Sequence, residues 1–272
     1  MTKLLTFLSA NGIVQHYALH DGARANTPTI VFVNALGTDL RIWNAVLPAL
    51  AGAYRVLVYD KRGHGLSDTP SGPYVIDDYV DDLIALLDGL GIDDIALVGL
   101  SMGGLIAQRL AVRFPERLRA LVLSGTAARI GTDATWAARI ADIENSGIAG
   151  VADAVLERWF TPAFRTGEAA ALAGWRNMLT RTPVDGYLGA CAAIRTADLR
   201  PDARRIGTPT LCIVGDHDGS TPPDVVRETA VLIPGARFAV IENSGHIPAI
   251  EQPAALLALL GQHFRDAGLP NA

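Results

Sequence analysis

The sequence predicts an α/β protein, a mostly parallel, doubly wound sheet into which a helical cap is inserted. Short apolar segments of the kind found in buried strands alternate with helical patterns along most of the chain. An interval of about 85 residues between residues 123 and 210 breaks this alternation, and it is too long for an ordinary strand-to-helix connection. The chain has 272 residues, half of them hydrophobic, which is enough for one large domain with its insertion.

The chain is predicted to begin with a β-hairpin. Met1–Ala10 has an apolar part that is too short for an export signal, and Asn11-Gly12 is a turn sequence followed by a second strand-like segment. His16 and His20 lie on this hairpin, and we expect both side chains to face solvent.

The remaining predicted strands are buried on both faces of the sheet, because they are continuously apolar and do not alternate with polar residues. They are Thr29–Val33, Arg55–Tyr59, Ile95–Val98, Ala120–Leu123, Thr210–Val214 and Arg237–Ile241. Helical patterns lie between and after them, two of them beginning with proline. These are Tyr79–Leu90, Leu105–Arg113, Pro223–Leu232 and Pro253–Phe264.

The long interval is predicted to form the cap, residues 127–204, and the core is predicted to comprise residues 1–126 and 205–272. The helical segments of the cap are Thr135–Asn145, Val151–Phe160, Glu168–Thr180 and Tyr187–Ala197. We expect the cap above the carboxyl ends of the strands, where open α/β sheets bind ligands. Trp159 and Trp175 are expected to pack within the cap, whereas Trp136 near its entrance is a candidate for substrate contact.

Composition points to no macromolecular partner. A net charge of −5 gives no reason to expect nucleic acid or an acidic membrane surface as a partner. No apolar segment approaches the ~18 residues of a transmembrane helix. Cys191 and Cys212 lack the spacing of metal ligands, so we expect reduced thiols in a cytoplasmic protein.

The chemistry is predicted to centre on Gly99-Leu100-Ser101-Met102-Gly103, a G-x-S-x-G motif between a strand and a helix. A serine on such a sharp turn is held in a strained conformation with its hydroxyl exposed. Glycine is needed around it, because side chains there would collide with the neighbouring strand or helix. The sequence therefore predicts Ser101 as a nucleophile.

A serine nucleophile needs a base, and His246 is the candidate because its loop follows the last predicted strand at the same sheet edge. His64 is expected to order the loop after residue 59, and His263 to lie at the surface or in packing.

The acid is expected between the serine and the histidine in the chain. Asp216 and Asp218 both lie after the strand that ends near Val214; Asp218 is favoured because it lies far enough along to turn back toward His246. Asp216 is expected to bond backbone amides of its own loop. The other position used in this fold, Ser124-Gly125-Thr126, has no carboxylate.

Two backbone N–H groups are expected to form an oxyanion hole. Met102 would supply one as the residue after the nucleophile, and Leu36 would supply the other from the loop after the strand Thr29–Val33.

Together these residues resemble the α/β-hydrolase superfamily over nearly the whole chain. Within it, Asn34–Trp43 is similar to the N-S-L-G-T-D-L-R-x-W segment of 3-oxoadipate enol-lactone hydrolases, with Ala35 in place of the usual serine. Tyr59–Asp68 matches the motif Y-D-x-R-G-H-G-x-S, which the superfamily shares, and Leu156–Pro162 and Gly186–Ala193 resemble the cap of the same hydrolases.

The resemblance implies hydrolysis of a small anionic lactone, 3-oxoadipate enol-lactone, late in bacterial breakdown of catechol or protocatechuate. It implies an acyl-enzyme on Ser101 and no metal or cofactor. A carboxylate on the substrate calls for a cation in the pocket, and the candidates are Arg62, Arg129 and Arg139.

Other functions remain open at this point. Another serine carboxylesterase or lactonase, a haloperoxidase-like perhydrolase or a C–C bond hydrolase would use the same catalytic residues. A non-catalytic ligand receptor on the same fold is the alternative from another class.

Overall fold

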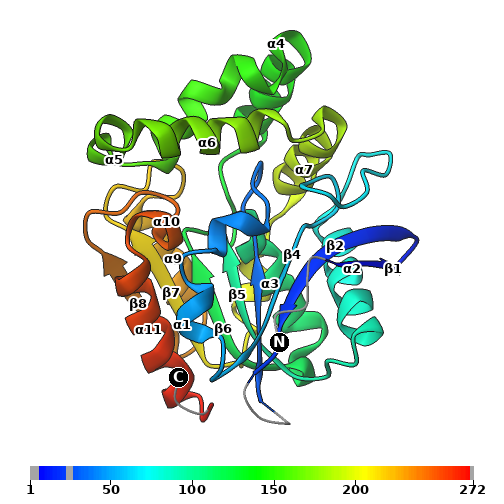
Figure 1. Cartoon of the computed structure of the whole chain (residues 1–272), viewed down its shortest axis with the longest axis vertical. Coiled ribbons are helices and arrows are strands. Elements are labelled where there is room, and N and C mark those ends of the chain that lie inside the picture. Colours follow the sequence, from blue (N-terminus) through cyan, green and yellow to red (C-terminus); the bar gives the residue numbers. More distant parts are fainter. Residues whose placement is uncertain (1–5, 23–26, 270–272) are drawn as a thin grey trace.

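The predicted strands form a single sheet in the computed structural model, which describes residues 6–22 and 27–269 (Figure 1). Within those residues the sheet has eight strands in the order β1-β2-β4-β3-β5-β6-β7-β8. Their bounds are β1 Thr6–Ala10, β2 Ile13–His20, β3 Thr29–Val33, β4 Arg55–Tyr59, β5 Ile95–Leu100, β6 Leu118–Ser124, β7 Thr210–Gly215 and β8 Arg237–Ile241. Strand β2 pairs antiparallel with β1 and β4, and all other pairs are parallel.

The N-terminal hairpin forms as predicted, with positive φ angles of 52° at Asn11 and 75° at Gly12. The part of the predicted first strand before Thr6 lies outside the described residues. The expectation that His16 faces solvent is wrong: the residue is 3% exposed, and its Nδ1 lies 2.6 Å from Asp60 Oδ2. Strand β2 is an internal strand between β1 and β4, so the loop after β4 reaches this histidine.

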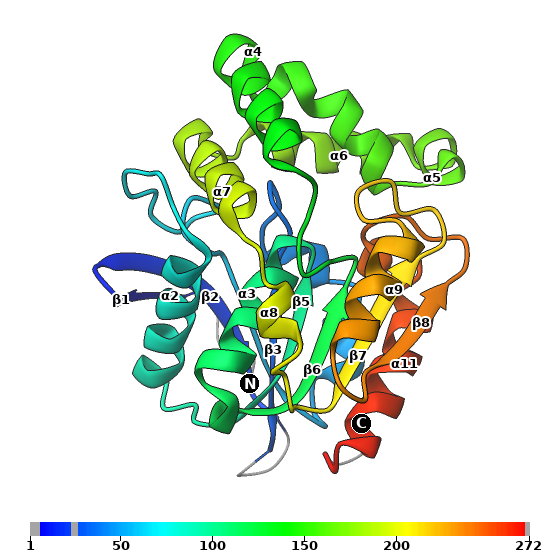
Figure 2. The same ribbon diagram turned by 180° about the vertical axis from the view of Figure 1, so that it is seen from behind.

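Helices cover both faces of the sheet. Helices α2 (Ile76–Gly89), α3 (Met102–Arg113), α8 (Arg200–Ala203) and α9 (Pro223–Leu232) lie on the face seen in Figure 2. Helices α1 (Leu47–Leu50) and α11 (Pro253–Asp266) lie on the opposite face, and α10 (Pro248–Glu251) precedes α11. Short 3₁₀ helices span Leu40–Trp43 and Pro115–Arg117. Strand residues alternate between the two cores, with Val31 in one and Phe32 in the other.

The region predicted as a cap forms a layer of helices above the carboxyl ends of the strands (Figure 1). It comprises α4 (Asp133–Trp159), α5 (Pro162–Gly167), α6 (Ala169–Thr180) and α7 (Val184–Thr196). The two helices predicted in this part of the cap are both present: α4 is a helix on either side of Gly147, whose φ of 66° and ψ of 175° are not helical. Every helix among the described residues is too short or too polar to span a membrane.

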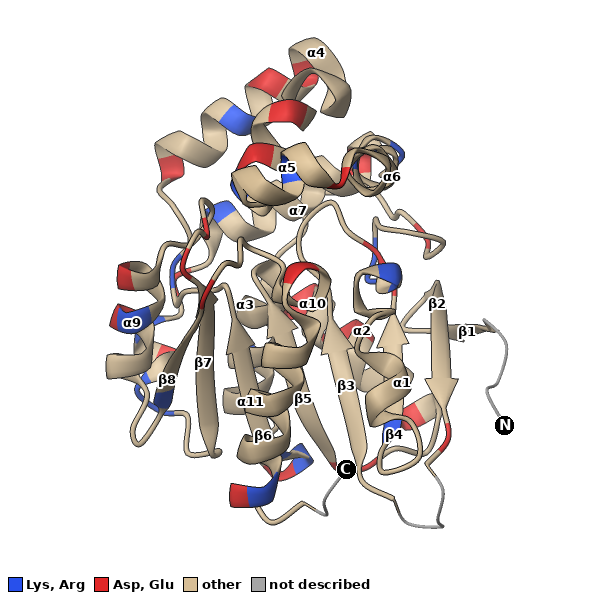
Figure 3. Cartoon of the chain, turned by 60° about the vertical axis from the view of Figure 1, so that its left-hand side comes forward, with Lys and Arg blue, Asp and Glu red and all other residues tan. Residues whose placement is uncertain are grey.

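Charged residues lie mainly on the outer helices and loops, as Figure 3 shows for α4, α5 and α9. Strands β3, β5 and β7 contain no charged residue, which matches their burial in the middle of the molecule.

The cap layer contacts the core through closely packed backbones. A Cβ atom on Gly186 of α7 would lie 2.3 Å from the carbonyl oxygen of Gly63, closer than real contacts allow. On Gly37, in the loop after β3, it would lie 2.6 Å from Leu179 and 2.9 Å from Tyr187. Glycine at these positions lets α6 and α7 sit directly on the loops that follow β3 and β4.

Candidate active site

Ser101 lies on a strained turn between β5 and α3. Its φ of 57° and ψ of −117° are unusual for a residue with a side chain. A Cβ atom on Gly99 would lie 2.3 Å from Gly103 O, and one on Gly103 would lie 2.2 Å from Val33 O. Neither glycine can be replaced without moving backbone, so the spacing of the motif follows from close packing.

The neighbouring strand β6 holds this turn in place. The N–H of Ser101 donates to the carbonyl of Ser124 at 2.9 Å, and the hydroxyl of Thr126 donates to the carbonyl of Ser101 at 2.7 Å. These bonds help offset the backbone strain at Ser101, which typically amounts to about 1–3 kcal/mol.

His246 and Asp218 form a buried pair at the same sheet edge. The Nδ1 atom of His246 lies 2.8 Å from Asp218 Oδ2 and 3.0 Å from Oδ1. The carboxylate also accepts bonds from the N–H of Ser220 and from both the N–H and the hydroxyl of Thr221. With Nδ1–H donating to Asp218, Nε2 of His246 is left as a proton acceptor.

The alternatives for the acid take other positions. Asp216 Oδ1 accepts a bond from the N–H of Ser244, at 3.0 Å. The expectation that Asp216 bonds its own loop is therefore wrong; it joins its loop to the one that carries His246. A Cβ atom on Gly125 would meet Asp218 Oδ2 at 3.0 Å, so the end of β6 lies against the His246–Asp218 pair.

Of the two residues predicted to supply the oxyanion hole, one follows Ser101 in the chain and the other lines the same cavity as Ser101. Met102 begins α3, and Leu36 lines the cavity that contains Ser101. Among the described residues, neither N–H donates to a protein acceptor.

Buried side chains hold the loop after β3, residues 34–38. Asn34 donates to the carbonyl of Tyr59 at 2.9 Å and accepts from Trp43 Nε1 at 2.8 Å. His64 Nε2 accepts from the N–H of Gly37 at 3.0 Å. Burial and nearby Lys61 hold the pKa of His64 well below its usual value, so this histidine is neutral and can accept that bond.

A cavity of about 240 Å³ opens between the cap layer and the sheet edge. Ser101 and His246 line its floor, and Trp136, Arg139 and Arg158 from α4 line it from above. Trp136 donates from Nε1 to the carbonyl of Ile130 at 2.7 Å, which fixes its ring at the rim. Trp159 is 4% exposed and also lines the cavity, whereas Trp175 does not.

The predicted arginines separate into two groups. Arg139 lines the cavity. Arg62 instead pairs with Asp82 at 2.6 Å, and Arg129 pairs with Asp198 at 3.3 Å; neither of them lines the cavity. Arg158 also lines the cavity and was not among the arginines predicted from the sequence. Its spacing could have indicated it, because Arg158 follows Val155 by one helical turn and precedes Trp159, and all three residues line the cavity.

Arg139 and Arg158 make the cavity cationic. Within the described residues, neither guanidinium forms an ion pair with a carboxylate. Burial and the nearby charge of Arg139 lower the pKa of Arg158. Arg139 also interacts with the buried hydroxyl of Tyr187. Unneutralised cations beside Ser101 favour a ligand that carries a negative charge.

Glu251 joins the loop of His246 to the cap layer. One carboxylate oxygen accepts from the N–H of Gly245 at 2.7 Å, and the other accepts from the hydroxyl and the N–H of Thr161 at 2.7 and 3.1 Å. The cap and the proposed base are thus connected through one partly buried side chain.

Comparison with known proteins identifies the family. The sequence model described as "Alpha/beta hydrolase family" matches residues 30–259. The chain belongs to the alpha/beta hydrolase family. Among characterised relatives, 3-oxoadipate enol-lactonase 2 of Acinetobacter baylyi is 38% identical over 248 residues, covering 91% of this chain and 92% of the relative.

A solved structure agrees with this assignment. The enol-lactonase from Burkholderia xenovorans LB400 has a TM-score of 0.92 and 40% identity to this chain, covering 96% of this chain and 100% of that one. The predicted fold class and the resemblance to enol-lactone hydrolases are confirmed, and this alpha/beta hydrolase is a carboxylic ester hydrolase. The 2-hydroxymuconate semialdehyde hydrolase of Pseudomonas sp. (strain CF600) is also similar, at 33% identity over 83% of this chain and 81% of the relative.

Proposed function

We propose that this alpha/beta hydrolase opens the enol-lactone of 3-oxoadipate, with Ser101 as nucleophile, His246 as base and Asp218 as the acid that orients it. The observation that carries the proposal is the pair of unneutralised guanidiniums, Arg139 and Arg158, in the cavity that Ser101 and His246 line. A neutral ester has no carboxylate that could pair with these guanidiniums, whereas a lactone with a carboxymethyl group has one. The identity to two enol-lactonases of Acinetobacter baylyi, 38% and 35%, supports the same substrate.

In the proposed reaction Ser101 attacks the ring carbonyl while His246 Nε2 takes the hydroxyl proton. The N–H groups of Leu36 and Met102 stabilise the negative charge that develops on the carbonyl oxygen. The tetrahedral adduct then collapses, and the ring C–O bond breaks. His246 returns its proton to the leaving enol oxygen, and the enol tautomerises to the ketone.

Water completes the cycle. The acyl group is bound to Ser101 through an ester bond, and the former leaving group remains part of it, because opening a ring releases no separate molecule. His246 then takes a proton from water as the water oxygen attacks the acyl carbon. The second tetrahedral adduct collapses, the bond to Ser101 Oγ breaks, His246 returns its proton to Oγ, and the diacid leaves. The substrate carboxylate, held by Arg139 and Arg158, orients the ring toward Ser101. The place of this step in catechol or protocatechuate breakdown, in the cytoplasm, is part of the same proposal.

An ultraviolet assay of enol-lactone loss with the purified protein tests the proposal, with p-nitrophenyl acetate as a neutral comparison. We expect a kcat/KM for the lactone far above that for the acetate, and loss of both activities in Ser101→Ala. Preference for the acetate would contradict the lactone as substrate. Turnover that survives in Ser101→Ala would contradict the proposed nucleophile.

The semialdehyde hydrolase among the relatives makes a C–C bond hydrolase the second candidate. Its name indicates an acyclic substrate, so the assay is repeated with 2-hydroxymuconate semialdehyde. A higher kcat/KM for that compound would favour the second candidate while leaving the roles of Ser101 and His246 intact.

A further inference from the structure

Lys61 is a buried cation that the proposed mechanism leaves unused. Its residue is 1% exposed, in the loop that follows β4. The only lysines of the sequence are Lys3 and Lys61, while arginine supplies nearly all other basic positions. The Lys61 ammonium donates to the carbonyl oxygen of Ala35 at 2.7 Å.

That carbonyl belongs to the same peptide group as the N–H of Leu36. The peptide group is planar and trans, so its C=O and N–H point in opposite directions. A cation on the Ala35 oxygen therefore fixes the direction in which the Leu36 N–H points. It also polarises the peptide, which strengthens the N–H as a donor, because hydrogen-bonded groups in series reinforce one another at low dielectric.

The Ala35 oxygen does not need Lys61 in order to be satisfied. The hydroxyl of Thr38 donates to it at 2.9 Å, and the N–H of Thr38 lies at 3.3 Å. Burying an ammonium is expensive, and an apolar side chain of similar length is often as stable or more stable at such a site. Packing and hydrogen bonding of the loop alone thus give no reason for a charge at position 61.

We propose that Lys61 is a positioning residue of the oxyanion hole, whose ammonium acts through the Ala35–Leu36 peptide to orient and polarise the Leu36 N–H. This inference rests on the proposed roles of Ser101 and Leu36.

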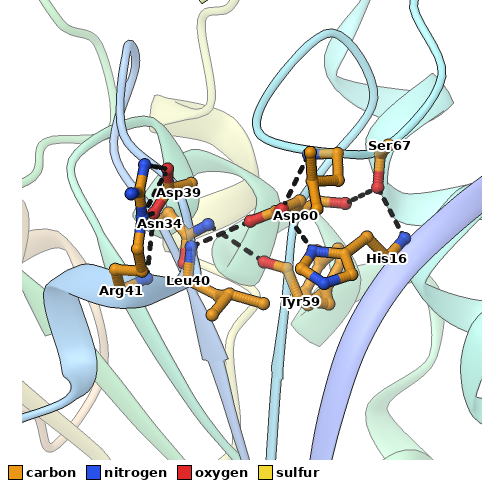
Figure 4. Close-up of polar contacts among 9 residues, drawn as sticks. His16, Asn34, Asp39, Leu40, Arg41, Tyr59, Asp60 and Ser67 are labelled. Atoms are coloured by element: carbon orange, nitrogen blue, oxygen red, sulfur yellow. Dashed lines mark hydrogen bonds and ion pairs between the residues drawn. The ribbon is translucent and has the colours of Figure 1, made fainter. Parts of the chain in front are cut away.

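The charges around Lys61 set the pH range of this effect. Asp60 and Asp39 attract the ammonium, and buried His64 faces it from the same loop. Both carboxylates are also engaged elsewhere: Figure 4 shows Asp60 between His16 and the N–H of Leu40, and Asp39 pairs with Arg41. Burial outweighs their attraction and lowers the pKa of Lys61 to about 7. The ammonium therefore loses its proton as pH rises through neutrality.

The variant Lys61→Met tests the inference with p-nitrophenyl acetate, a substrate that needs no arginine site. Losing one oxyanion donor outright typically lowers the rate by ~10²–10³, and Lys61 acts only through such a donor, so we expect kcat to fall about tenfold with KM nearly unchanged. Affinity for phenylboronic acid, which forms a tetrahedral adduct on a nucleophilic serine, should fall by a similar factor. The melting temperature should stay close to that of the wild type.

Arg109→Met is the matched control for removal of a cation. Arg109 pairs with Asp77 and Asp202 on the far side of α3 and does not line the cavity. We expect a lower melting temperature with kcat unchanged. A folded Lys61→Met protein with wild-type kcat and boronate affinity would overturn the inference. If Ser101→Ala also retained turnover, the proposed function would be at fault instead.

A measurement on the wild type keeps the inference testable even if Lys61→Met does not fold. Lysine labelled with ¹⁵N gives signals only from Lys3 and Lys61, so the ionisation of Lys61 can be followed directly. Wild-type kcat should fall over the pH range in which Lys61 loses its proton, and this alkaline decline should be absent from Lys61→Met. A wild-type kcat that stays level through the ionisation of Lys61 would refute the role assigned to it.

Discussion

The backbone N–H of His246 donates to the carbonyl oxygen of Trp159 at 2.8 Å. Trp159 is the last residue of α4, so the position of the proposed base depends on a helix of the cap layer. The preceding carbonyl, of Arg158, accepts from the N–H of Gly219 at 3.2 Å, directly after Asp218. The end of α4 therefore holds the loops of both the proposed base and the proposed acid.

Replacing the proposed acid separates its role from that of its neighbour. Asp218→Asn should lower kcat by roughly 10⁴, because an amide no longer holds His246 in the tautomer that leaves Nε2 free. Asp216→Asn weakens the bond that the N–H of Ser244 donates, because a neutral amide oxygen replaces a charged acceptor, and it should reduce stability slightly with a far smaller effect on kcat. Steady-state kinetics of both variants on one substrate decide the matter; a larger loss in Asp216→Asn would reverse the assignment.

The two cavity arginines predict a change in substrate preference. Arg139→Met and Arg158→Met should each raise KM for the enol-lactone about tenfold or more, while KM for p-nitrophenyl acetate changes little, because a charge-assisted bond contributes about 1.5–3 kcal/mol. Arg129→Met, which alters an exposed arginine outside the cavity, is the matched control. Equal changes for the charged and the neutral substrate would argue against an anion site.

The bridge made by Glu251 predicts a coupled loss of stability and activity. Glu251→Gln leaves an amide group facing an N–H of Gly245 or Thr161, and we expect a loss of about 1–3 kcal/mol in the free energy of unfolding. The rate should fall as well, because Gly245 precedes His246. Urea unfolding and kcat measure the two effects. Glu228→Gln, on the exposed surface of α9, should change neither.

The neutral state of His64 predicts a pH dependence of stability. Its pKa in the folded protein lies well below 6.5, the ordinary value that the unfolded chain retains. Below about pH 6.5 the unfolded state therefore binds a proton that the folded state does not, and stability decreases as pH falls. His64→Gln keeps a donor and an acceptor without titrating. Urea midpoints between pH 7 and 5 should fall less in this variant than in the wild type; parallel curves would show that His64 does not contribute.

The contact between Gly186 and Gly63 predicts opposite effects for two glycine substitutions. Gly186→Ala places a methyl group 2.3 Å from the Gly63 carbonyl and should destabilise the protein by about 1–3 kcal/mol. Gly174→Ala, in α6 where nothing lies within 4 Å, should stabilise it by about 0.5–1 kcal/mol. Thermal melts compare the two. A stable Gly186→Ala protein would mean that α7 can move away from the core easily.

Much of the fold could be predicted because its strands are apolar on both faces. The segments that became β3 and β7 were predicted close to their observed bounds for this reason. The two helices predicted over Thr135–Asn145 and Val151–Phe160 correspond to the two parts of α4, but the sequence did not show that a single non-helical residue, Gly147, joins them. Local sequence does not distinguish a kink from a longer connection.

The proximity of candidate residues could be predicted where they follow strand ends, but not where their partners are distant in the chain. His246 and Asp218 were expected to lie together because the loops after β7 and β8 meet at one edge, and the two side chains are in hydrogen-bond contact. Arg62 was a candidate for binding the substrate carboxylate, but it is paired with Asp82 instead. Nothing near Arg62 in the sequence indicates that Asp82 is its partner. The burial of His16 against Asp60 also depends on a pairing across the sheet that only the assembled fold reveals.

The carbonyl groups at the end of α4 bear on how such an enzyme can be recombined. An exchange of caps between relatives would transfer the acceptors for Gly219 and His246 together with the lining of the cavity. A chimera keeps its base in position only if the incoming helix ends along the same path as Arg158 and Trp159. If the junction lies before the last turn of α4, the part of the cavity lining that comes from the incoming cap can vary. The host protein then keeps its own carbonyl groups of Arg158 and Trp159, and with them the positions of the loops that carry Asp218 and His246.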